Sequence, residues 1–397
     1  MSACARTVAD YALIGDLQSA ALVGRSGSID WFCAPRFDSD ASFAALVGDD
    51  DNGSWCVAPI DENARVTRRY RGATLVLETT FDAVDGRIRL VDFMPTGTQQ
   101  RTIVRVGGER LTGEEEASWL AGFAHSKPVR IANDAHMQFQ PGVYGDLVMC
   151  FEHAQRVGVP FEAEHWQIIE SVMHYIEKVW QRPGNGIWET RKGGRQYVDS
   201  KVMAWVGIDR GIALAQRGGF VTDVAHWQAL AARMHAEIVR AGYDEHRGTF
   251  TQYYGSQELD ASLLLMPVVG FLPPDDPRVA RTVAAIEREL VVDGFVYRYS
   301  ADGVHEPGGA LPSEGAFTIC GFWLAQAYAL MGRHDDARAV FERLVGTAND
   351  VGLLSEEFGV ARGIAIGNVP QGFPHAGLID AAHLLSQRRP ASVGVAR

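Results

Sequence analysis

The sequence has few cysteines, and they are scattered. The 397-residue chain contains five, none spaced as in a CxxC motif: Cys4, Cys33, Cys56, Cys150 and Cys320. An odd and dispersed set predicts neither a disulfide framework nor a zinc site. Such a set is typical of a reducing compartment, so we expect a cytoplasmic protein.

Long apolar runs and an excess of basic residues are also missing. No run of about 18 apolar residues occurs, and the first 16 residues lack a basic segment followed by an apolar one. We therefore expect neither a membrane span nor an export signal. The formal net charge is −12, from 37 basic and 49 acidic residues, which argues against nucleic acid or an anionic membrane as a partner.

Motifs for metals and nucleotides are absent as well. The twelve histidines include no HExxH pattern, and no GxGxxG follows an expected strand. The pair Gly107 and Gly108 is not followed by Lys and Ser or Thr, so it does not read as a phosphate-binding loop. We expect no metal site and no cofactor.

The first part of the chain reads as a β-rich domain. Residues 74–81 and 87–93 are expected strands, and Asp85 and Gly86 between them are a turn signal. The composition changes abruptly from about residue 106 to 140, which is typical either of a linker or of a substrate-facing loop. We therefore predict a β-rich domain over 1–106 and a junction over 107–143.

From residue 144 onward the apolar periodicity is helical. Apolar residues recur at spacings of three and four in the first strong segment: Trp166, Ile169, Val172, Ile176 and Val179. Further helices are expected near 202–214, 223–241, 258–268, 277–291, 315–332, 335–347 and 374–387. The chain is thus predicted to be an α+β multidomain protein with a helical domain over 144–397. Recurring helix pairs are expected of a toroid of helical hairpins, although any helical domain can give them.

Two glutamates stand in settings that suit cleavage of a glycosidic bond. That reaction needs a proton donor and a second carboxylate that serves as base or nucleophile. Glu189 follows Ile187 and Trp188, and an apolar wall raises the pKa of a carboxyl group, as a general acid requires. Glu356 adjoins Glu357, and repulsion within such a pair can turn one carboxylate into a cleft. By local context alone, Glu189 is more commonly a structural glutamate, and Glu356 and Glu357 more commonly belong to a solvated acidic loop.

Other candidates have equally plain alternatives. Glu314 precedes an expected helix and can simply cap it, as can Glu258 and Asp260 at the start of another. Trp188 and Trp323 can stack on sugar rings, but tryptophan more often packs in a core.

Many segments of the chain resemble one enzyme family. Residues 10–23 and 27–39 are similar to the trehalase-like N-terminal module of bacterial glycoside hydrolase family 15. The resemblance continues, in the same order as in that family, through residues 126–133, 186–189, 200–205, 251–255, 258–264, 270–278, 314–317 and 352–357. It covers nearly the whole chain.

The resemblance implies a fold and an activity. The fold is an N-terminal β-sandwich followed by an (α/α)6 toroid, and the activity is inverting hydrolysis of α-glucosidic bonds with Glu189 as general acid and Glu356 as general base. Residues expected to shape the sugar site are Trp188, Arg130, Lys201 and Glu314. No cofactor is required, although some trehalases of this type need phosphate and Mg²⁺.

The chain departs from the family at two places. The family's Trp-x-Arg-Asp-Ala motif, which holds the sugar, is missing, and residues 95–106 run directly into a segment that resembles the middle of the toroid. This implies a large internal deletion, and hence a truncated sandwich and an incomplete toroid that a second copy of the chain is a candidate to complete. Residues 138–145 carry Pro141 and Gly142 where relatives have Leu and Asp; inside a helix, proline would cost about 3 kcal/mol.

Trehalose, cleaved to glucose, is the expected substrate, because the N-terminal module is most similar to that of trehalases. One alternative is a glucoamylase acting on maltodextrins. Another is a catalytically inactive remnant that binds sugar, because the residues that position a substrate contribute strongly to catalysis and the Arg-Asp pair is absent.

Overall fold

The computed structural model of the chain describes residues 7–34, 36–61, 63–84, 86–94, 114–131, 134–191, 193–299 and 314–387. They form two compact units. The first comprises Met1–His136, Val345–Phe358 and Ile364–Gly372, and the second comprises Met137–Leu344, Gly359–Gly363 and Phe373–Arg397. The predicted α+β class is confirmed, with strands in the first part of the chain and helices after it. The junction at residues 106–108, where we infer a deletion, lies outside the described residues.

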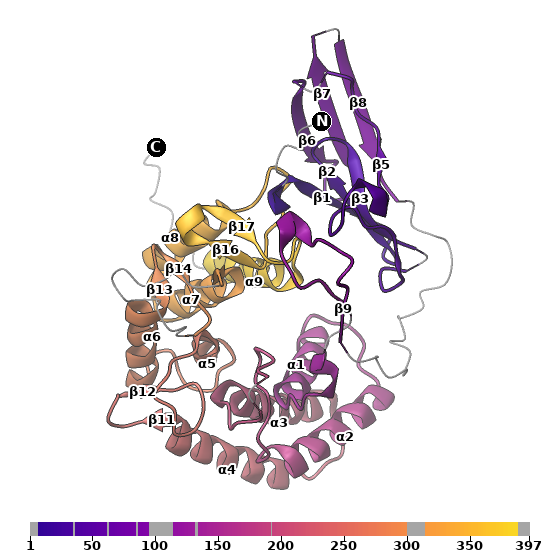
Figure 1. The fold of residues 1–397 in the computed structure, drawn as a ribbon. Helices are drawn as coiled ribbons and strands as arrows, with labels where there is room; N and C mark the ends of the chain where they lie inside the picture. The colour runs from indigo at the N-terminus through magenta and orange to yellow at the C-terminus, as the bar shows by residue number, and fades with distance from the viewer. Residues whose placement is uncertain are drawn as a thin grey trace, which may run out of the picture. The chain divides into compact units, whose positions relative to one another are not determined.

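An antiparallel sheet opens the first unit (Figure 1). Its order is β1-β2-β3-β4, and β5 also pairs with β3. Alternate residues of β1 and β2, among them Ala12, Ile14, Ala21 and Val23, point to one face and form a small core with Leu77. The strands are β1 (Tyr11–Gly15), β2 (Ala20–Gly24), β3 (Ser28–Cys33), β4 (Ala41–Phe43) and β5 (Trp55–Cys56).

A second antiparallel sheet of the first unit contains the predicted hairpin. It has the order β6 (Arg65–Tyr70), β7 (Leu77–Ala83) and β8 (Gly86–Asp92). Ala83 pairs with Gly86, so the chain reverses where the sequence predicts a turn. β7 begins later than predicted because the Thr74 hydroxyl binds the Arg71 carbonyl and the Val76 amide, which closes a local turn.

Shorter strands also occur along the chain. They are β9 (Glu115–Glu116), β10 (Arg130–Ile131), β11 (Tyr243–Asp244), β12 (Thr249–Phe250), β13 (Val291–Val292), β14 (Phe295–Val296), β15 (Ala316–Phe317), β16 (Glu357–Gly359) and β17 (Ile364–Ile366). Three pairs of them are antiparallel two-stranded ladders: β9 with β10, β11 with β12, and β13 with β14.

Helices make up most of the second unit, as predicted. They are α1 (Gly142–Arg156), α2 (Ala163–Val179), α3 (Val198–Gly218), α4 (Val224–Gly242), α5 (Leu265–Val268), α6 (Pro277–Leu290), α7 (Thr318–Leu330), α8 (His334–Val345) and α9 (Gly372–Gln387). Local signals set several ends: Asp276 caps α6 ahead of Pro277, and Gly219 ends α3 in the left-handed region. Among the described residues, we find no helix that combines the length and apolar character needed to cross a bilayer.

The prediction of one helix over 258–268 is wrong in its first half. Asp260 is extended and pairs with Tyr299 in a β-bridge, and the amide of Ala261 donates to the carbonyl of Arg298 at 2.8 Å. Only a 3-10 turn (Ala261–Leu264) and the short α5 follow. A tertiary pairing therefore overrides the local helical pattern here.

Pro141 does not destabilise a helix, because it does not lie inside one. Pro141 is the residue immediately before α1, with a φ of −66°, so its ring lies outside the helix interior. Three residues into the helix, Gly145 permits close packing, because a Cβ there would lie 1.9 Å from the Met203 carbonyl oxygen of α3. The segment around Pro141 thus suits the start of a helix packed tightly against α3.

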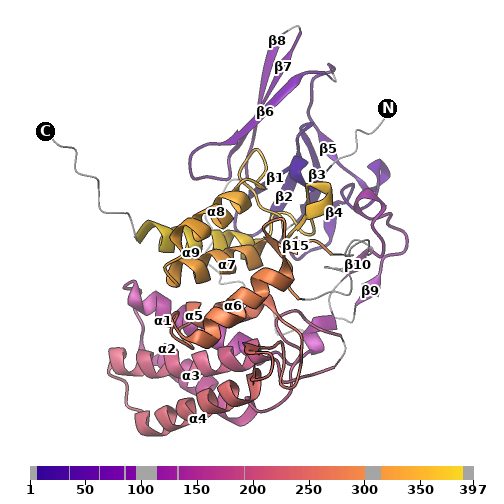
Figure 2. The same cartoon turned by 90° about the vertical axis from the view of Figure 1, so that its left-hand side faces the viewer.

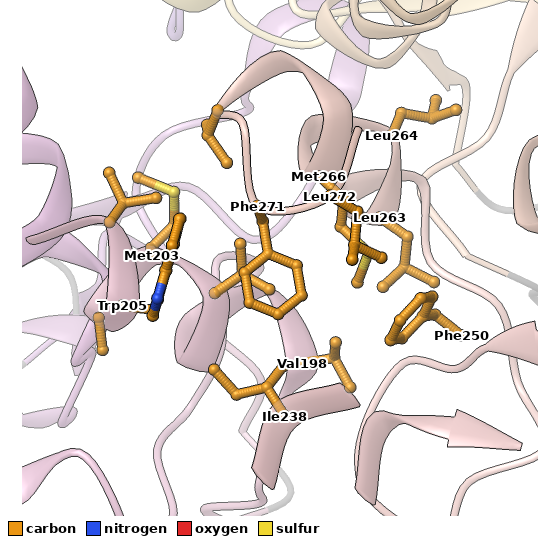
Figure 3. Close-up of a cluster of buried hydrophobic side chains, with 14 of the residues drawn as sticks. Val198, Met203, Trp205, Ile238, Phe250, Leu263, Leu264, Met266, Phe271 and Leu272 are labelled. Atoms are coloured by element: carbon orange, nitrogen blue, oxygen red, sulfur yellow. The ribbon is translucent and has the colours of Figure 1, made fainter. Parts of the chain in front are cut away.

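The core of the second unit centres on α3. Helices α1, α2 and α4 all pack against it, and Figures 1 and 2 show these helices side by side. Helices α3 and α7 are buried on nearly all sides, whereas α2 and α4 bury one stripe each. At the centre, Phe271 meets Trp205 edge-on at 5.2 Å between ring centroids, surrounded by apolar side chains of several elements (Figure 3).

Candidate active site

The loop between α2 and α3 carries Glu189. Its two ends are joined, because the amide and hydroxyl of Thr190 donate to the Asn185 carbonyl and the Asn185 side chain donates to the Thr190 carbonyl. Gly186 has a φ of +72°, and a Cβ there would lie 3.0 Å from the ring of Tyr197, so this position requires glycine. The loop is therefore a closed, well-packed turn.

Glu189 adopts a strained backbone on this loop. Its φ is +53°, a left-handed conformation that costs a non-glycine residue about 1–2 kcal/mol. The carbonyl of Glu189 accepts a hydrogen bond from the Gln138 side chain at 3.0 Å, and the side chain of Glu189 is exposed. Strain of this kind persists where the surroundings enforce it and is concentrated at functional sites.

Trp188 is anchored to a buried carboxylate. Its indole Nε1 lies 3.0 and 2.9 Å from the two carboxylate oxygens of Asp260, and its ring contacts Phe317 and Trp323. Asp260 also accepts hydrogen bonds from Gln252 and from the amide and hydroxyl of Ser262. Burial raises the pKa of Asp260, and these donors oppose the rise. The residue directly before Glu189 is thus fixed from the core.

A second buried carboxylate supports the neighbouring residue of the loop. Asp199, in the first turn of α3, accepts hydrogen bonds from Ser200 and from the backbone of Ile187. Burial, together with the negative charge of Asp260, raises the pKa of Asp199 to about 7. Two core carboxylates therefore hold the two residues that precede Glu189.

Arg298 joins Trp188 to Glu314. The guanidinium donates to both carboxylate oxygens of Glu314, with Nε at 2.9 Å from one of them, and lies 5.7 Å from the ring of Trp188. It also lies over the rings of Tyr299 and Phe317, at 4.8 and 4.7 Å. Trp188 and Glu314, two of the predicted site residues, thus meet at one arginine.

Lys201 lies beneath this loop with its side chain buried. Its ammonium donates to the carbonyls of Trp180 and Arg182, the second at 2.8 Å, and so holds the segment after α2. Burial lowers the pKa of Lys201 to about 8. These contacts are with the backbone, and the expected contact with a sugar stays a prediction.

The other two predicted site residues belong to the first unit. The Oε2 atom of Glu356 accepts two hydrogen bonds from Asn368, one from the amide at 3.1 Å and one from the side chain at 2.8 Å. Arg130, on β10, forms ion pairs with Glu114 at 3.0 Å and Glu116 at 3.8 Å. The second unit thus brings together Trp188, Glu189, Glu314 and the underlying Lys201, whereas Glu356 and Arg130 are residues of the first unit.

Sequence reasoning missed three residues of this site and undervalued a fourth. Asp199, Gln252 and Arg298 did not stand out, and Asp260 was considered only as a helix cap. Asp260 does cap the 3-10 turn after it, but it also binds Trp188. An aspartate in the first turn of α3, just ahead of the apolar run 202–208, is the signal that could have pointed to Asp199. In the described part of the chain, no group of three or more His, Cys, Asp or Glu side chains is placed to hold a metal ion.

Comparison with known proteins identifies the family. The model of the glycosyl hydrolases family 15 matches residues 94–383, and that of the trehalase-like N-terminal domain matches residues 2–125. The chain belongs to glycosyl hydrolases family 15. Curated relatives include the trehalase of Mycobacterium tuberculosis, 43% identical over 279 residues, and the trehalase of Thermoplasma acidophilum, 33% identical over 347 residues.

The chain matches only about half of the length of each of these relatives. The matched part is 70% of this chain and 40% of the M. tuberculosis protein, and 87% of this chain and 58% of the T. acidophilum protein. A wild-type glycosidase of known structure aligns with a TM-score of 0.55 and 24% identity, covering 66% of this chain and 72% of that one. A bacterial glucoamylase in complex with acarbose aligns with a TM-score of 0.54 and 16% identity, covering 63% and 41%. These two structures are evidence for the fold alone.

Proposed function

We propose that this chain hydrolyses α-glucosidic bonds with inversion of configuration and that its substrate is trehalose, which it converts to glucose. The relatives named trehalase support the substrate. The observation that carries the proposal is the strained loop of Glu189, which two buried carboxylates hold from the core.

Glu189 and Glu356 are the proposed acid and base. Glu189 protonates the glycosidic oxygen as the bond to the departing glucose breaks, and Glu356 removes a proton from the water that attacks the anomeric carbon. Two hydrogen bonds from Asn368 orient the Glu356 carboxylate for this task. We further propose that Trp188, Glu314, Arg130 and Lys201 shape the sugar site, with Lys201 acting through the backbone that it binds.

For the architecture, we propose a truncated β-sandwich over 1–106, a junction over 107–143 and an incomplete (α/α)6 toroid over 144–397. The alternation of α3 and α7, buried on nearly all sides, with the one-sided α2 and α4 supports the toroid, because inner helices of such an array are covered on most sides. A second copy of the chain remains the candidate to complete it.

Glucose release from trehalose tests the function. Wild-type protein is compared with Glu189→Gln and Glu356→Gln, and with Glu245→Gln, which alters an exposed carboxylate of the second unit. Each of the first two variants is expected to lose about 10²–10⁴-fold in kcat, the usual contribution of general acid–base catalysis. Wild-type activity no higher than that of Glu189→Gln would overturn the proposal.

The same assay separates the alternatives. Faster release from maltose than from trehalose would indicate a glucoamylase. The absence of the Trp-x-Arg-Asp-Ala motif favours the inactive sugar-binding remnant. Heat release on titration with glucose, in a protein that cleaves neither disaccharide, would establish that alternative.

A further inference from the structure

The segment that carries the proposed base belongs to the N-terminal β unit. Residues 349–356, here called the base segment, follow α8, yet Asp350 binds Arg68 of strand β6, 282 residues earlier. The guanidinium Nε and Nη2 lie 3.1 and 2.6 Å from the two carboxylate oxygens, a bidentate geometry. The side chain of Arg68 is fully buried, and that of Asp350 is 26% exposed.

Arg68 is in turn bonded to the sheet. Its Nη1 donates to the carbonyl of Asp10 at 2.6 Å and to that of Val23 at 3.4 Å. Arg25 adds a second ion pair to Asp350 at 3.1 Å. The carboxylate of Asp350 is therefore held by two arginines, one of which is bonded to the backbone both just before β1, at Asp10, and within β2, at Val23.

Asn349 also connects the base segment to the N-terminal sheet. Its side-chain amide donates two hydrogen bonds and accepts two. Its Nδ2 donates to the carbonyls of Ala9 and Tyr11 at 3.2 and 2.9 Å. Its Oδ1 accepts from the amides of Val351 and Leu353 at 3.1 and 2.9 Å. One side chain thus binds the start of the first strand and folds the base segment around itself.

The path continues to the carboxylate of Glu356. Leu354 is fully buried, and its carbonyl accepts from the amide of Gln371 at 3.3 Å. The amide of Glu356 donates to the carbonyl of Asn368 at 2.9 Å, and Asn368 donates twice to Oε2. Hydrogen bonds and short stretches of chain within one unit thus connect the sheet to the carboxylate.

We propose that Arg68, Asn349 and Asp350 are positioning residues for the general base, so that the N-terminal sheet is part of the catalytic apparatus. The inference rests on the proposed function, in which Glu356 activates water. A base displaced by as little as 1 Å can lower turnover about 100-fold, so these distant residues control kcat.

Hydrogen exchange combined with kinetics tests this inference on the full chain. Asp350→Asn and Asn349→Ala are preferred to Arg68→Gln, because removing the buried arginine can prevent folding. Arg69→Gln is the matched control: Arg69 is the next residue of β6, its side chain is 74% exposed, and its partner Glu78 keeps Arg71. Amides of β7 report whether the first unit as a whole stays folded.

For both variants we expect about tenfold faster exchange in the base segment with β7 unchanged, and an approximately 100-fold lower kcat with KM unchanged. A purely structural role predicts instead that amide exchange in β7 accelerates equally and that the loss of activity matches the loss of folded protein.

Unchanged exchange in the base segment, or an unchanged kcat despite faster exchange, overturns the inference. A wild-type chain that releases no glucose overturns the proposed function, and the exchange result then decides alone whether the sheet holds this segment.

Discussion

The indole nitrogen of Trp188 lies within 3.0 Å of both carboxylate oxygens of Asp260. A buried carboxylate needs hydrogen-bond donors, and the indole N–H is one of four that Asp260 receives. The bond fixes the indole ring beside Phe317 and Trp323, and with it the backbone that enters Glu189.

Asp260→Asn is expected to impair both stability and turnover. The amide group of asparagine would direct N–H donors at the donors of Trp188 and Ser262, so that at least one buried group loses its partner. We expect the free energy of unfolding to fall by about 1–3 kcal/mol, as measured by urea denaturation, and kcat for trehalose to fall about 100-fold. Asp223→Asn at the start of α4 is the control, because aspartate and asparagine cap helices equally well.

Asp199 is expected to make the protein less stable as the pH rises from about 4 to about 7. The pKa of its carboxyl group is about 7 in the folded protein against an ordinary value of 3.8, so between these pH values the folded state holds a proton that the unfolded state has released. The contribution of Asp199 to the free energy of unfolding is complete below pH 4. By pH 8 this contribution has fallen by an amount on the order of 4 kcal/mol. Asp199→Asn should therefore be more stable than wild type at pH 8 and similar at pH 4. Urea denaturation at both pH values checks this, and equal differences at both would contradict it; Asp275→Asn, at an exposed site, serves as control.

Relief of backbone strain at Glu189 should be measurable. Glu189→Gly and Glu189→Gln both remove the proposed acid, but only glycine adopts a φ of +53° without steric cost. We expect the free energy of unfolding of the glycine variant to exceed that of the glutamine variant by about 0.5–1 kcal/mol. This difference allows for the greater conformational entropy of glycine in the unfolded chain. A glycine variant that is the less stable of the two would show that the loop is not strained.

Lys201→Met separates a structural lysine from a sugar-binding one. The carbonyls of Trp180 and Arg182 would lose their donor, so we expect the free energy of unfolding to fall by about 1–3 kcal/mol. The KM for trehalose should stay the same. A raised KM with unchanged stability would point instead to direct contact with the sugar. Lys178→Met, at an exposed position of α2, is the comparison.

Much of the fold could be predicted from the sequence because its elements are marked locally. The hairpin of β7 and β8 and the helices from α2 to α4 follow from apolar periodicity, caps and turn residues. The segment 258–268 could not, because Asp260 and Ala261 pair with residues near Arg298. A pairing partner so far along the chain leaves no trace in local periodicity.

The site was predicted unevenly for the same reason. Glu189 and Trp188 stand in one recognisable tetrapeptide, whereas their supports, Asp199 and Arg298, come from separate parts of the chain. A buried aspartate that holds an indole has the same sequence signature as one that caps a helix. Only the three-dimensional contacts distinguish the two roles.

The bond between Trp188 and Asp260 also has a consequence for the order of assembly. Its partners are 72 residues apart, and α3 and α4 lie between them. Because long-range contacts form only after the intervening chain has been arranged, the Glu189 loop is completed late in folding. During synthesis, a nascent chain that has not yet exposed Asp260 lacks this anchor, so the proposed acid is set in place only after the helices beneath it have formed.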